Sequence, residues 1–299
     1  RHPVQQSIAS NHMTSVGVVV LTMGSRPDEL RRGLESLLAQ EDVELDIVCV
    51  GNGWQPVDLP PGVRPVFLPE NLGACGGRNA GAAAVHGDIL FFFDDDAWLT
   101  DPQFVRRAVA AFDAWPELGI LQPRVHDPLS DADATRWIPR VRKGDPHESS
   151  AAFSVWEGAL LVRRSTFDAA GGFGDELFYY HEGIELAWRC WDSGNVAWYA
   201  GNLEAHHPAA APTRHDMFYR MHGRNRVWVA RRNLPTPLIP LYVGTWTALH
   251  VIKSRGDKAG LRPWFDGWKE GWREDPGPRR PISWRTVGRM AMRGRPPVI

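Results

Sequence analysis

The sequence predicts an α/β fold in which a mostly parallel central sheet is flanked by helices and followed by a C-terminal helical region. Short apolar runs of strand length alternate with helix-like segments over the first hundred residues, a pattern typical of parallel sheets. One run, residues 89–93, is apolar at every position, as in a strand buried on both faces. From residue 224 onward the chain has 16 basic and 5 acidic residues and six of the 14 tryptophans, whereas the rest has 18 basic and 30 acidic residues.

The composition is that of a globular protein with a sizeable core. Of the 299 residues, 43% are hydrophobic and 23% are charged. Apolar runs of eighteen residues are absent, so no membrane-spanning helix is expected. The three cysteines (Cys49, Cys75 and Cys190) lack metal-type spacing, which indicates a reducing cytoplasm. Residues 1–12, before Met13, have the character of an expression-tag remnant.

The first hundred residues are expected to alternate between strands and helices. Strands are predicted over residues 16–21, 47–50 and 63–68, the second ending in a turn at residues 51–53. A helix beginning at Asp28 places four leucines on one face, and a second helix, over residues 79–86, follows a glycine-rich segment. The four leucines are Leu30, Leu34, Leu37 and Leu38.

Three consecutive aspartates follow the buried strand directly. Adjacent carboxylates repel one another, and hard divalent cations such as Mg²⁺ take oxygen ligands. Because residues i and i+2 of an extended segment point the same way, Asp94 and Asp96 are expected to act together while Asp95 faces the other side. A solvated acidic turn after a core strand is the alternative interpretation.

Polar residues at strand ends are expected to converge on one crevice at the carboxyl edge of the sheet. Thr22, Asn52 and the three aspartates all occupy such positions. The glycine-rich segment, residues 71–81, would let backbone amides approach an anion, and Arg78 can bind phosphate. Close packing of a helix on the sheet is the alternative explanation of these glycines. Together with the carboxylates, the segment predicts a nucleoside-diphosphate site with a metal ion.

As a set, these motifs resemble those of the family 2 glycosyltransferases, which are inverting sugar transferases with the nucleotide-binding fold called GT-A. The resemblance covers residues 16–235 in the family's order, and the C-terminal end is similar to that of actinobacterial members. The matching segments are residues 18–22, 52–53, 71–73, 76–81, 93–96 and 171–173 leading to Phe178, then Glu182-x-x-Glu185-Leu186 with Arg189, and 224–226.

The resemblance implies roles for individual residues. The aspartates correspond to the family's Asp-x-Asp motif, in which Asp94 faces the nucleotide or the metal and Asp96 ligates Mg²⁺ or Mn²⁺. His206 is preferred over the adjacent His207 as a further metal ligand. The residues expected to bind the donor are Thr22, Arg26, Asn52, Arg78, Asp94 and Asp95.

Inversion at the anomeric carbon requires a general base, and here the sequence departs from the family's pattern. The family has Glu-Asp-x-Asp-Leu where this chain has a glycine at the second position, Gly183. Glu182 is the favoured base and Glu185 the second candidate, although Glu185 can instead pair with Arg189 one turn further along the helix. Gly51 is a second departure, because many members have an aspartate there that reads the nucleotide base.

The later parts of the chain suggest where an acceptor would bind. Residues 125–157 are expected to form an irregular loop in which Trp137 and Trp156 either stack on sugars or pack internally. Residues 216–232 are predicted to form a helix with one apolar and one basic face. Trp264, Trp268 and Trp272 recur every four residues. Such segments fit either an anionic membrane surface or packing on the catalytic domain or a second subunit.

The expected organisation is a GT-A catalytic domain over residues 13–215, with a nucleotide-sugar half (13–100) and an acceptor half (101–215), followed by a basic helical region (216–299). The predicted enzyme is a cytoplasmic transferase that moves a sugar from a dTDP- or UDP-linked donor to a glycan, a lipid-linked acceptor or a secondary metabolite. Peripheral contact with the inner face of the plasma membrane and formation of a homodimer are left open by the sequence. Nucleic acid is not an expected partner. The alternatives are a sugar-phosphate nucleotidyltransferase and a degenerate sugar-nucleotide-binding subunit.

Overall fold

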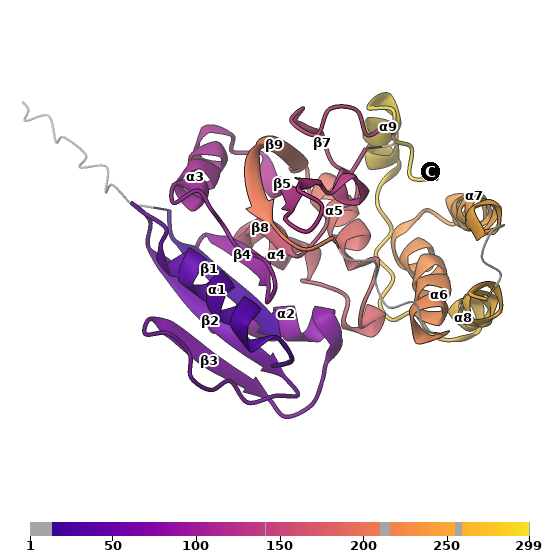
Figure 1. The fold of residues 1–299 in the computed structure, drawn as a ribbon. Coiled ribbons are helices and arrows are strands. Elements are labelled where there is room, and N and C mark those ends of the chain that lie inside the picture. Colours follow the sequence, from indigo (N-terminus) through magenta and orange to yellow (C-terminus); the bar gives the residue numbers. More distant parts are fainter. Residues whose placement is uncertain (1–13, 141, 210–215, 255–258, 299) are drawn as a thin grey trace, which may run out of the picture.

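One mixed β-sheet organises the molecule, for which a computed structural model describes residues 14–140, 142–209, 216–254 and 259–298 (Figure 1). The strand order is β3-β2-β1-β4-β8-β5-β9-β7, and β6 pairs with β5 at the side. The strands are β1 (Val16–Thr22), β2 (Leu45–Asn52), β3 (Val63–Leu68), β4 (Ile89–Asp94), β5 (Leu118–Asp127), β6 (Ala132–Asp133), β7 (Ser150–Ala151), β8 (Ala159–Arg163) and β9 (Val196–His206).

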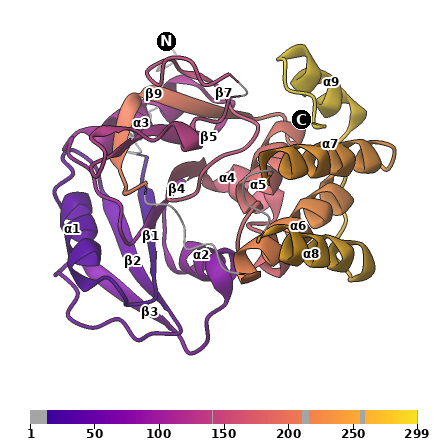
Figure 2. The same ribbon diagram turned by 45° about the vertical axis from the view of Figure 1, so that its right-hand side comes forward.

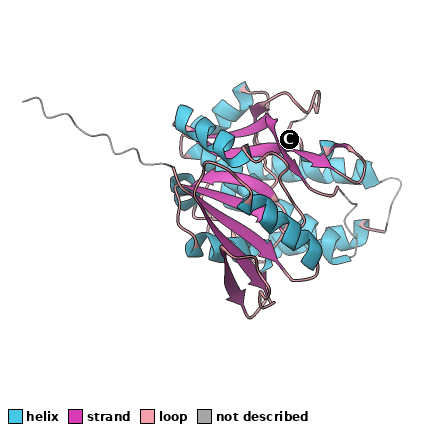
Figure 3. Ribbon diagram, turned by 60° about the vertical axis from the view of Figure 1, so that its left-hand side comes forward, coloured by secondary structure: helices cyan, strands magenta, loops and turns pink. Residues whose placement is uncertain are grey.

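Helices cover both faces of this sheet, and Figure 3 shows the strands gathered between them. They are α1 (Pro27–Leu38), α2 (Gly73–Ala84), α3 (Phe104–Ala114), α4 (Arg164–Ala170), α5 (Glu182–Asp192), α6 (Asp216–Asn233), α7 (Leu238–Lys253), α8 (Leu261–Arg273) and α9 (Trp284–Met292), with short 3₁₀ turns at Thr135–Trp137 and Asp175–Leu177. The predicted α/β class, with a mostly parallel sheet and C-terminal helices, is confirmed.

The strand before the aspartates is buried on both faces, as its sequence predicts. Strand β4 lies between β1, to which it is parallel, and β8, to which it is antiparallel. Phe92 packs with α2, α4 and α5 on one face, while Phe91 and Phe93 pack with α1 and α3 on the other. Because β1, β2 and β4 are parallel and in register, Thr22, Gly51 and Asp94 end at the same edge of the sheet.

The glycine-rich segment is helical, so the expectation of a turn that opens a helix at residue 79 was wrong. Helix α2 already begins at Gly73. A Cβ on Gly77 would lie 2.4 Å from Leu21 Cδ1, and one on Gly81 would lie 2.2 Å from Val19 Cγ1. The first-turn amides of Ala74 and Cys75 donate to the Phe178 carbonyl. These glycines therefore allow the helix to pack closely on the sheet, and those two amides are not directed at a ligand.

Residues 125–157 contain more structure than the expected irregular loop. Strand β5 continues to Asp127, the short strand β6 pairs with its end, and β7 pairs antiparallel with β9. Arg124 forms ion pairs with Asp133 on β6 and Glu204 on β9, which fastens this hairpin to the sheet. The segment is thus attached to β5 and to β9.

The C-terminal helices pack together beside the sheet (Figure 2). Helices α6 and α8 approach backbone to backbone, because a Cβ on Gly267 would lie 1.9 Å from the Arg220 carbonyl oxygen and one on Gly223 would lie 2.1 Å from that of Trp264. Trp264 is buried accordingly. The helix predicted over residues 216–232 is present as α6, but Arg232, which was assigned to its basic face, is buried.

Two further expectations from the sequence concern the cysteines and membrane-spanning helices. Cys49, Cys75 and Cys190 are buried free thiols. Across the described ranges, none of the helices has both the length and the hydropathy that crossing a bilayer requires. Contact with a membrane surface, homodimer formation and the proposed domain boundaries stay predictions. The suspected tag remnant, residues 1–12, lies outside the described residues.

Candidate active site

The site forms where the carboxyl ends of β1 and β4 meet the end of β9. Asp94 is the last residue of β4. The end of β9 is tied to the segment after β4 by a pair of backbone hydrogen bonds between Trp98 and His206, with N–O distances of 3.0 and 2.9 Å. This bridge brings the residue after β9, His207, next to the aspartates.

Asp94, Asp96 and His207 form a group suited to a metal ion. One potential ligand atom from each lies within 4.8 Å of the others, and His207 Nε2 is 2.8 Å from Asp96 Oδ1 and 3.8 Å from Asp94 Oδ2. Burial favours protonated Asp96, but the hydrogen bond from His207 and the charges of His207 and Arg26 hold the pKa of Asp96 below its usual value. Carboxylate oxygens and an imidazole nitrogen are both common ligands of divalent metal ions in proteins.

His206, the residue preferred from the sequence, points elsewhere. Its Nε2 is 3.0 Å from Glu204 Oε1 and 3.3 Å from Thr100 Oγ1. Consecutive residues of a strand face opposite sides, so only the register of β9 decides which of the two histidines meets the aspartates. The structure therefore favours His207 as the third member of the metal-binding group.

Asp95 faces the end of β1, as the alternation of an extended segment predicts. Thr22 Oγ1 donates to Asp95 Oδ2 at 2.7 Å, and Arg26 Nη1 lies 3.3 Å from Asp95 Oδ1 and also pairs with Asp96. Burial raises the pKa of Asp95 to about 6, with a smaller contribution from the charges of Asp94 and Asp96, while Thr22 and Arg26 oppose the shift. Thr22 and Arg26 thus order the carboxylate cluster.

Arg78 connects this cluster to a second group of carboxylates. The side chain is buried on α2 and donates from Nη2 to Asp94 Oδ1 at 2.8 Å and from Nη1 to Glu182 Oε1 at 3.4 Å. Glu182 is 2% exposed, and its Oε2 is buried without a hydrogen-bond partner in the described chain. Burial raises the pKa of Glu182 although the Arg78 charge opposes this shift.

A second glutamate, Glu157, lies beside Glu182 and was not singled out from the sequence. It is partly exposed, and its carboxylate fills the space in front of Gly183, where an added Cβ would lie 1.9 Å from Glu157 Oε1. Burial, followed by the charge of Glu182, raises the pKa of Glu157 well above its usual range. The only signal in the sequence was the missing aspartate at position 183, which leaves a space that another side chain can fill.

Glu185, the second candidate base, is engaged in a buried ionic network instead. Arg232 donates to both of its oxygens, from Nε at 2.7 Å and from Nη2 at 2.9 Å. Arg189 lies 3.0 Å from Oε1, so the anticipated pair with Arg189 is confirmed, and Asn233 donates to Oε2 at 2.6 Å. This network joins α5 to α6 and favours a structural role for Glu185.

Asn52 and Gly51 shape the neighbouring loop. The Asn52 amide donates to Asn71 Oδ1 at 2.9 Å and to the Gly73 carbonyl at 3.0 Å, and its oxygen accepts from the Leu72 amide at 2.8 Å. A Cβ on Gly51 would lie 1.8 Å from the Trp54 carbonyl oxygen. An aspartate at position 51 would therefore displace this loop, so base recognition through that position is not available here.

Aromatic rings border the metal-binding group. Trp137 and Trp156 stack with ring centroids 4.4 Å apart, and both meet the His207 ring edge-on with centroids 4.9 Å away. The two tryptophans pack against each other and against His207, and stacking of either ring on a sugar stays a prediction. They hold the His207 ring in place beside Asp96.

The backbone leading into Glu182 is strained and clamped. Phe178, Tyr180 and His181 have φ values of 62°, 75° and 73°, which are unfavourable for residues with side chains. Asn225 on α6 donates to the carbonyls of Tyr179 and Tyr180 at 2.7 and 3.0 Å, as well as to that of Leu177. The C-terminal helices thus help to fix the start of α5.

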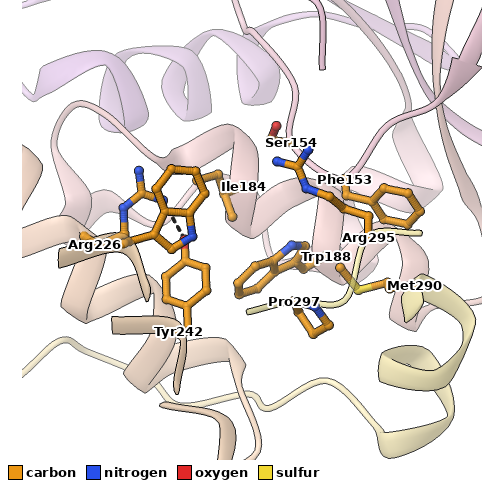
Figure 4. Close-up of a pocket in the computed structure, with 10 residues that line it drawn as sticks. Phe153, Ser154, Ile184, Trp188, Arg226, Tyr242, Met290, Arg295 and Pro297 are labelled. Atoms are coloured by element: carbon orange, nitrogen blue, oxygen red, sulfur yellow. Dashed lines mark hydrogen bonds between the residues drawn. The ribbon is translucent and has the colours of Figure 1, made fainter. Parts of the chain in front are cut away.

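Two cavities open between α5 and the C-terminal helices. One of about 350 Å³ is lined by His181 and by aromatic and basic residues of α6, α7 and α8. The other, of about 190 Å³, shares Arg226 and Trp246 with it, and Figure 4 shows Arg226 beside Tyr242, whose hydroxyl it contacts at 2.7 Å. The larger cavity adjoins the residue that precedes Glu182.

Comparison with known proteins identifies a family. Residues 18–169, slightly more than half of the chain, match the family described as Glycosyl transferase family 2. The N-acetylglucosaminyl-diphospho-decaprenol L-rhamnosyltransferase of Mycobacterium tuberculosis is 27% identical over 246 residues, which cover 68% of this chain and 80% of that protein.

Solved structures share the fold at low sequence identity. Residues 1–349 of S. aureus TarS in complex with UDP-GlcNAc align with a TM-score of 0.61 and 13% identity over 92% of this chain and 83% of that one. GalNAc-T7 with UDP, GalNAc and Mn²⁺ aligns with a TM-score of 0.58 and 14% identity. The alignment covers 88% of this chain and 57% of the GalNAc-T7 chain. The chain belongs to glycosyltransferase family 2 and is a glycosyltransferase with the GT-A fold.

Proposed function

We propose that this glycosyltransferase moves a sugar from a nucleoside-diphosphate sugar to an acceptor hydroxyl, with inversion at the anomeric carbon and with the help of Mn²⁺ or Mg²⁺. The observation that carries the proposal is the meeting of Asp94, Asp96 and His207 at the edge of the sheet. Arg78 contacts both Asp94 of this group and Glu182 at the start of α5. The residues that would stabilise a diphosphate thus lie next to carboxylates that could accept a proton.

Each side chain has a definable task in this proposal. Asp94, Asp96 and His207 would hold the metal ion, which neutralises charge on the leaving nucleoside diphosphate when bound. Arg26 is half-exposed at the rim and can turn from Asp96 toward a phosphate. Across the site, a carboxylate takes the proton of the attacking hydroxyl. The buried Arg78 fixes the position of Asp94 relative to Glu182.

The cavity next to His181 is the proposed acceptor site. Arg226 and Trp246 line it together with His222 and Lys253, so it offers positive charge beside aromatic rings. Aromatic faces pack against sugar rings, and cations pair with phosphates. A sugar carried on a diphosphate lipid, as in the name of the mycobacterial relative, has both features.

A transfer assay tests the proposal. The purified chain is incubated with Mn²⁺, with UDP-GlcNAc or dTDP-L-rhamnose, and with N-acetylglucosamine diphosphate carried on a short polyprenol. We expect one donor to release its nucleoside diphosphate and to yield a glycoside of inverted anomeric configuration by NMR, and EDTA to stop both. Retained configuration would contradict the inverting mechanism.

A pair of histidine variants tests the metal site within the same assay. His207→Ala removes the imidazole 2.8 Å from Asp96 and should lower the transfer rate by about 10²-fold, the scale for losing one electrostatic contact in an active site. His206→Ala, one residue away, should change the rate little because its ring faces Glu204. The reverse order would assign the third ligand to His206.

A further inference from the structure

The space in front of Gly183, where the family has an aspartate side chain, is occupied by the carboxylate of Glu157. We infer that Glu157 is the general base of this enzyme, taking the proton of the acceptor hydroxyl from the place where the side chain of residue 183 would stand. The inference rests on the proposed inverting transfer and adds to it a residue that neither the motifs nor the family match assigns.

The geometry at Gly183 supports this assignment. A Cβ built there would lie 1.9 Å from Glu157 Oε1 and 2.2 Å from the Val155 carbonyl oxygen. The segment before β8 thus lies directly against the first turn of α5, and only glycine leaves room for it. The Glu157 carboxylate therefore occupies the place that the side chain of residue 183 would take, although Glu157 belongs to the loop before β8.

The neighbours of Glu157 place it in the site. The preceding residue, Trp156, packs edge-on against the ring of His207. The following residue, Gly158, accepts a hydrogen bond from the Asp94 amide at 2.8 Å and has room for no side chain, since a Cβ would lie 2.5 Å from Asp94 Oδ2. Residues 156 and 158 therefore contact the metal-binding group, and the Glu157 side chain between them lies next to Gly183.

Burial raises the pKa of both glutamates, but Glu157 keeps part of its surface exposed whereas Glu182 does not. A general base must reach the hydroxyl whose proton it takes. Glu182 is 2% exposed and its Oε1 faces Arg78, so it lies behind the site surface. Glu157 is partly exposed. Glu182 accordingly acts as a positioning residue that orients Arg78, while Glu157 meets the acceptor.

The transfer step balances with these groups. The acceptor hydroxyl oxygen forms a bond to the anomeric carbon as its proton passes to a Glu157 oxygen. The bond between that carbon and the diphosphate oxygen breaks, and its electron pair leaves with the nucleoside diphosphate. The proton on Glu157 is released to solvent after the glycoside departs.

Glu157→Gln tests the inference in the transfer assay described above. We expect the transfer rate to fall by about 10²- to 10⁴-fold, the usual contribution of a general base. Thermal stabilisation of the variant by UDP or dTDP with Mn²⁺ should equal that of the wild type, because the carboxylate does not hold the donor. Glu148→Gln is the matched control, since Glu148 belongs to the same region but is exposed, and it should keep the wild-type rate.

Chemical rescue distinguishes the two glutamates. Added formate should restore part of the transfer by Glu157→Ala, whose vacated site solvent can reach, and none of that by Glu182→Ala. An active Glu157→Gln, or rescue of Glu182→Ala alone, would overturn the assignment of Glu157 while leaving the proposed function intact. A wild-type chain that neither transfers nor binds nucleotide with Mn²⁺ would overturn both.

Discussion

Asp96→Ala should reduce sugar transfer by roughly 10³-fold or more, the largest loss of activity that we expect from a single substitution. Asp96 lies 2.8 Å from His207 and also pairs with Arg26, so it joins the metal-binding group to the rim of the site. Its removal takes one carboxylate from the proposed metal site. The rate is measured with saturating donor and Mn²⁺.

Two companion variants make this result specific. Asp96→Asn keeps the shape of the side chain but not its charge, and it should lose nearly as much activity as the alanine variant. Asp168→Ala, at an exposed position on α4, should keep the wild-type rate. Substantial transfer by Asp96→Asn would show that the negative charge at this position is dispensable and would contradict the metal-binding role.

Arg232→Met should destabilise the fold by about 3 kcal/mol, because breaking a buried ion pair leaves an uncompensated charge. Arg232 is buried on α6, donates to both oxygens of Glu185 and pairs with Glu176. Methionine fills a similar volume but leaves Glu185 with Arg189 and Asn233 only. The measurement is urea unfolding at neutral pH, with the exposed Arg285→Met as control; equal midpoints for the two variants would refute the structural role.

The same network predicts a pH dependence of stability. Although burial opposes ionisation, the hydrogen bond from Arg232 and the charges of Arg189 and Arg232 lower the pKa of Glu185 below its ordinary value. A depressed carboxylate pKa stabilises the fold above the unfolded-state pKa, and this contribution disappears as pH falls through the folded-state value. The acid-side loss of stability should therefore be smaller in Arg232→Met than in the wild type.

The sequence predicted the parts of the fold that depend on local pattern. Strand β4 was recognised because every residue of 89–93 is apolar, and helix α1 because its leucines recur at helical spacing. The start of α2 was missed because glycine disfavours helices, whereas here Gly77 and Gly81 are required by contact with β1. That contact lies between segments distant in sequence and leaves no local signal.

For the site, too, the sequence predicted what depends on neighbouring residues and missed what depends on contacts between distant segments. The aspartates stand next to one another in sequence, and alternation along an extended chain already separated Asp95 from Asp94 and Asp96. Choosing His207 over His206 requires the register of β9 relative to β5 and to Trp98, which the sequence does not display. Glu157 approaches Gly183 only because a loop folds over the first turn of α5.

The most direct test of the central claim is a thermal-shift titration of the chain with UDP, dTDP and GDP, each with Mn²⁺ and with EDTA. A ligand that binds only the folded state raises the melting temperature as its concentration exceeds its dissociation constant. We predict stabilisation by one nucleoside diphosphate that requires Mn²⁺ and is lost in Asp96→Ala. Equal stabilisation with EDTA, or none at millimolar ligand, would contradict a metal-dependent donor site at Asp94, Asp96 and His207.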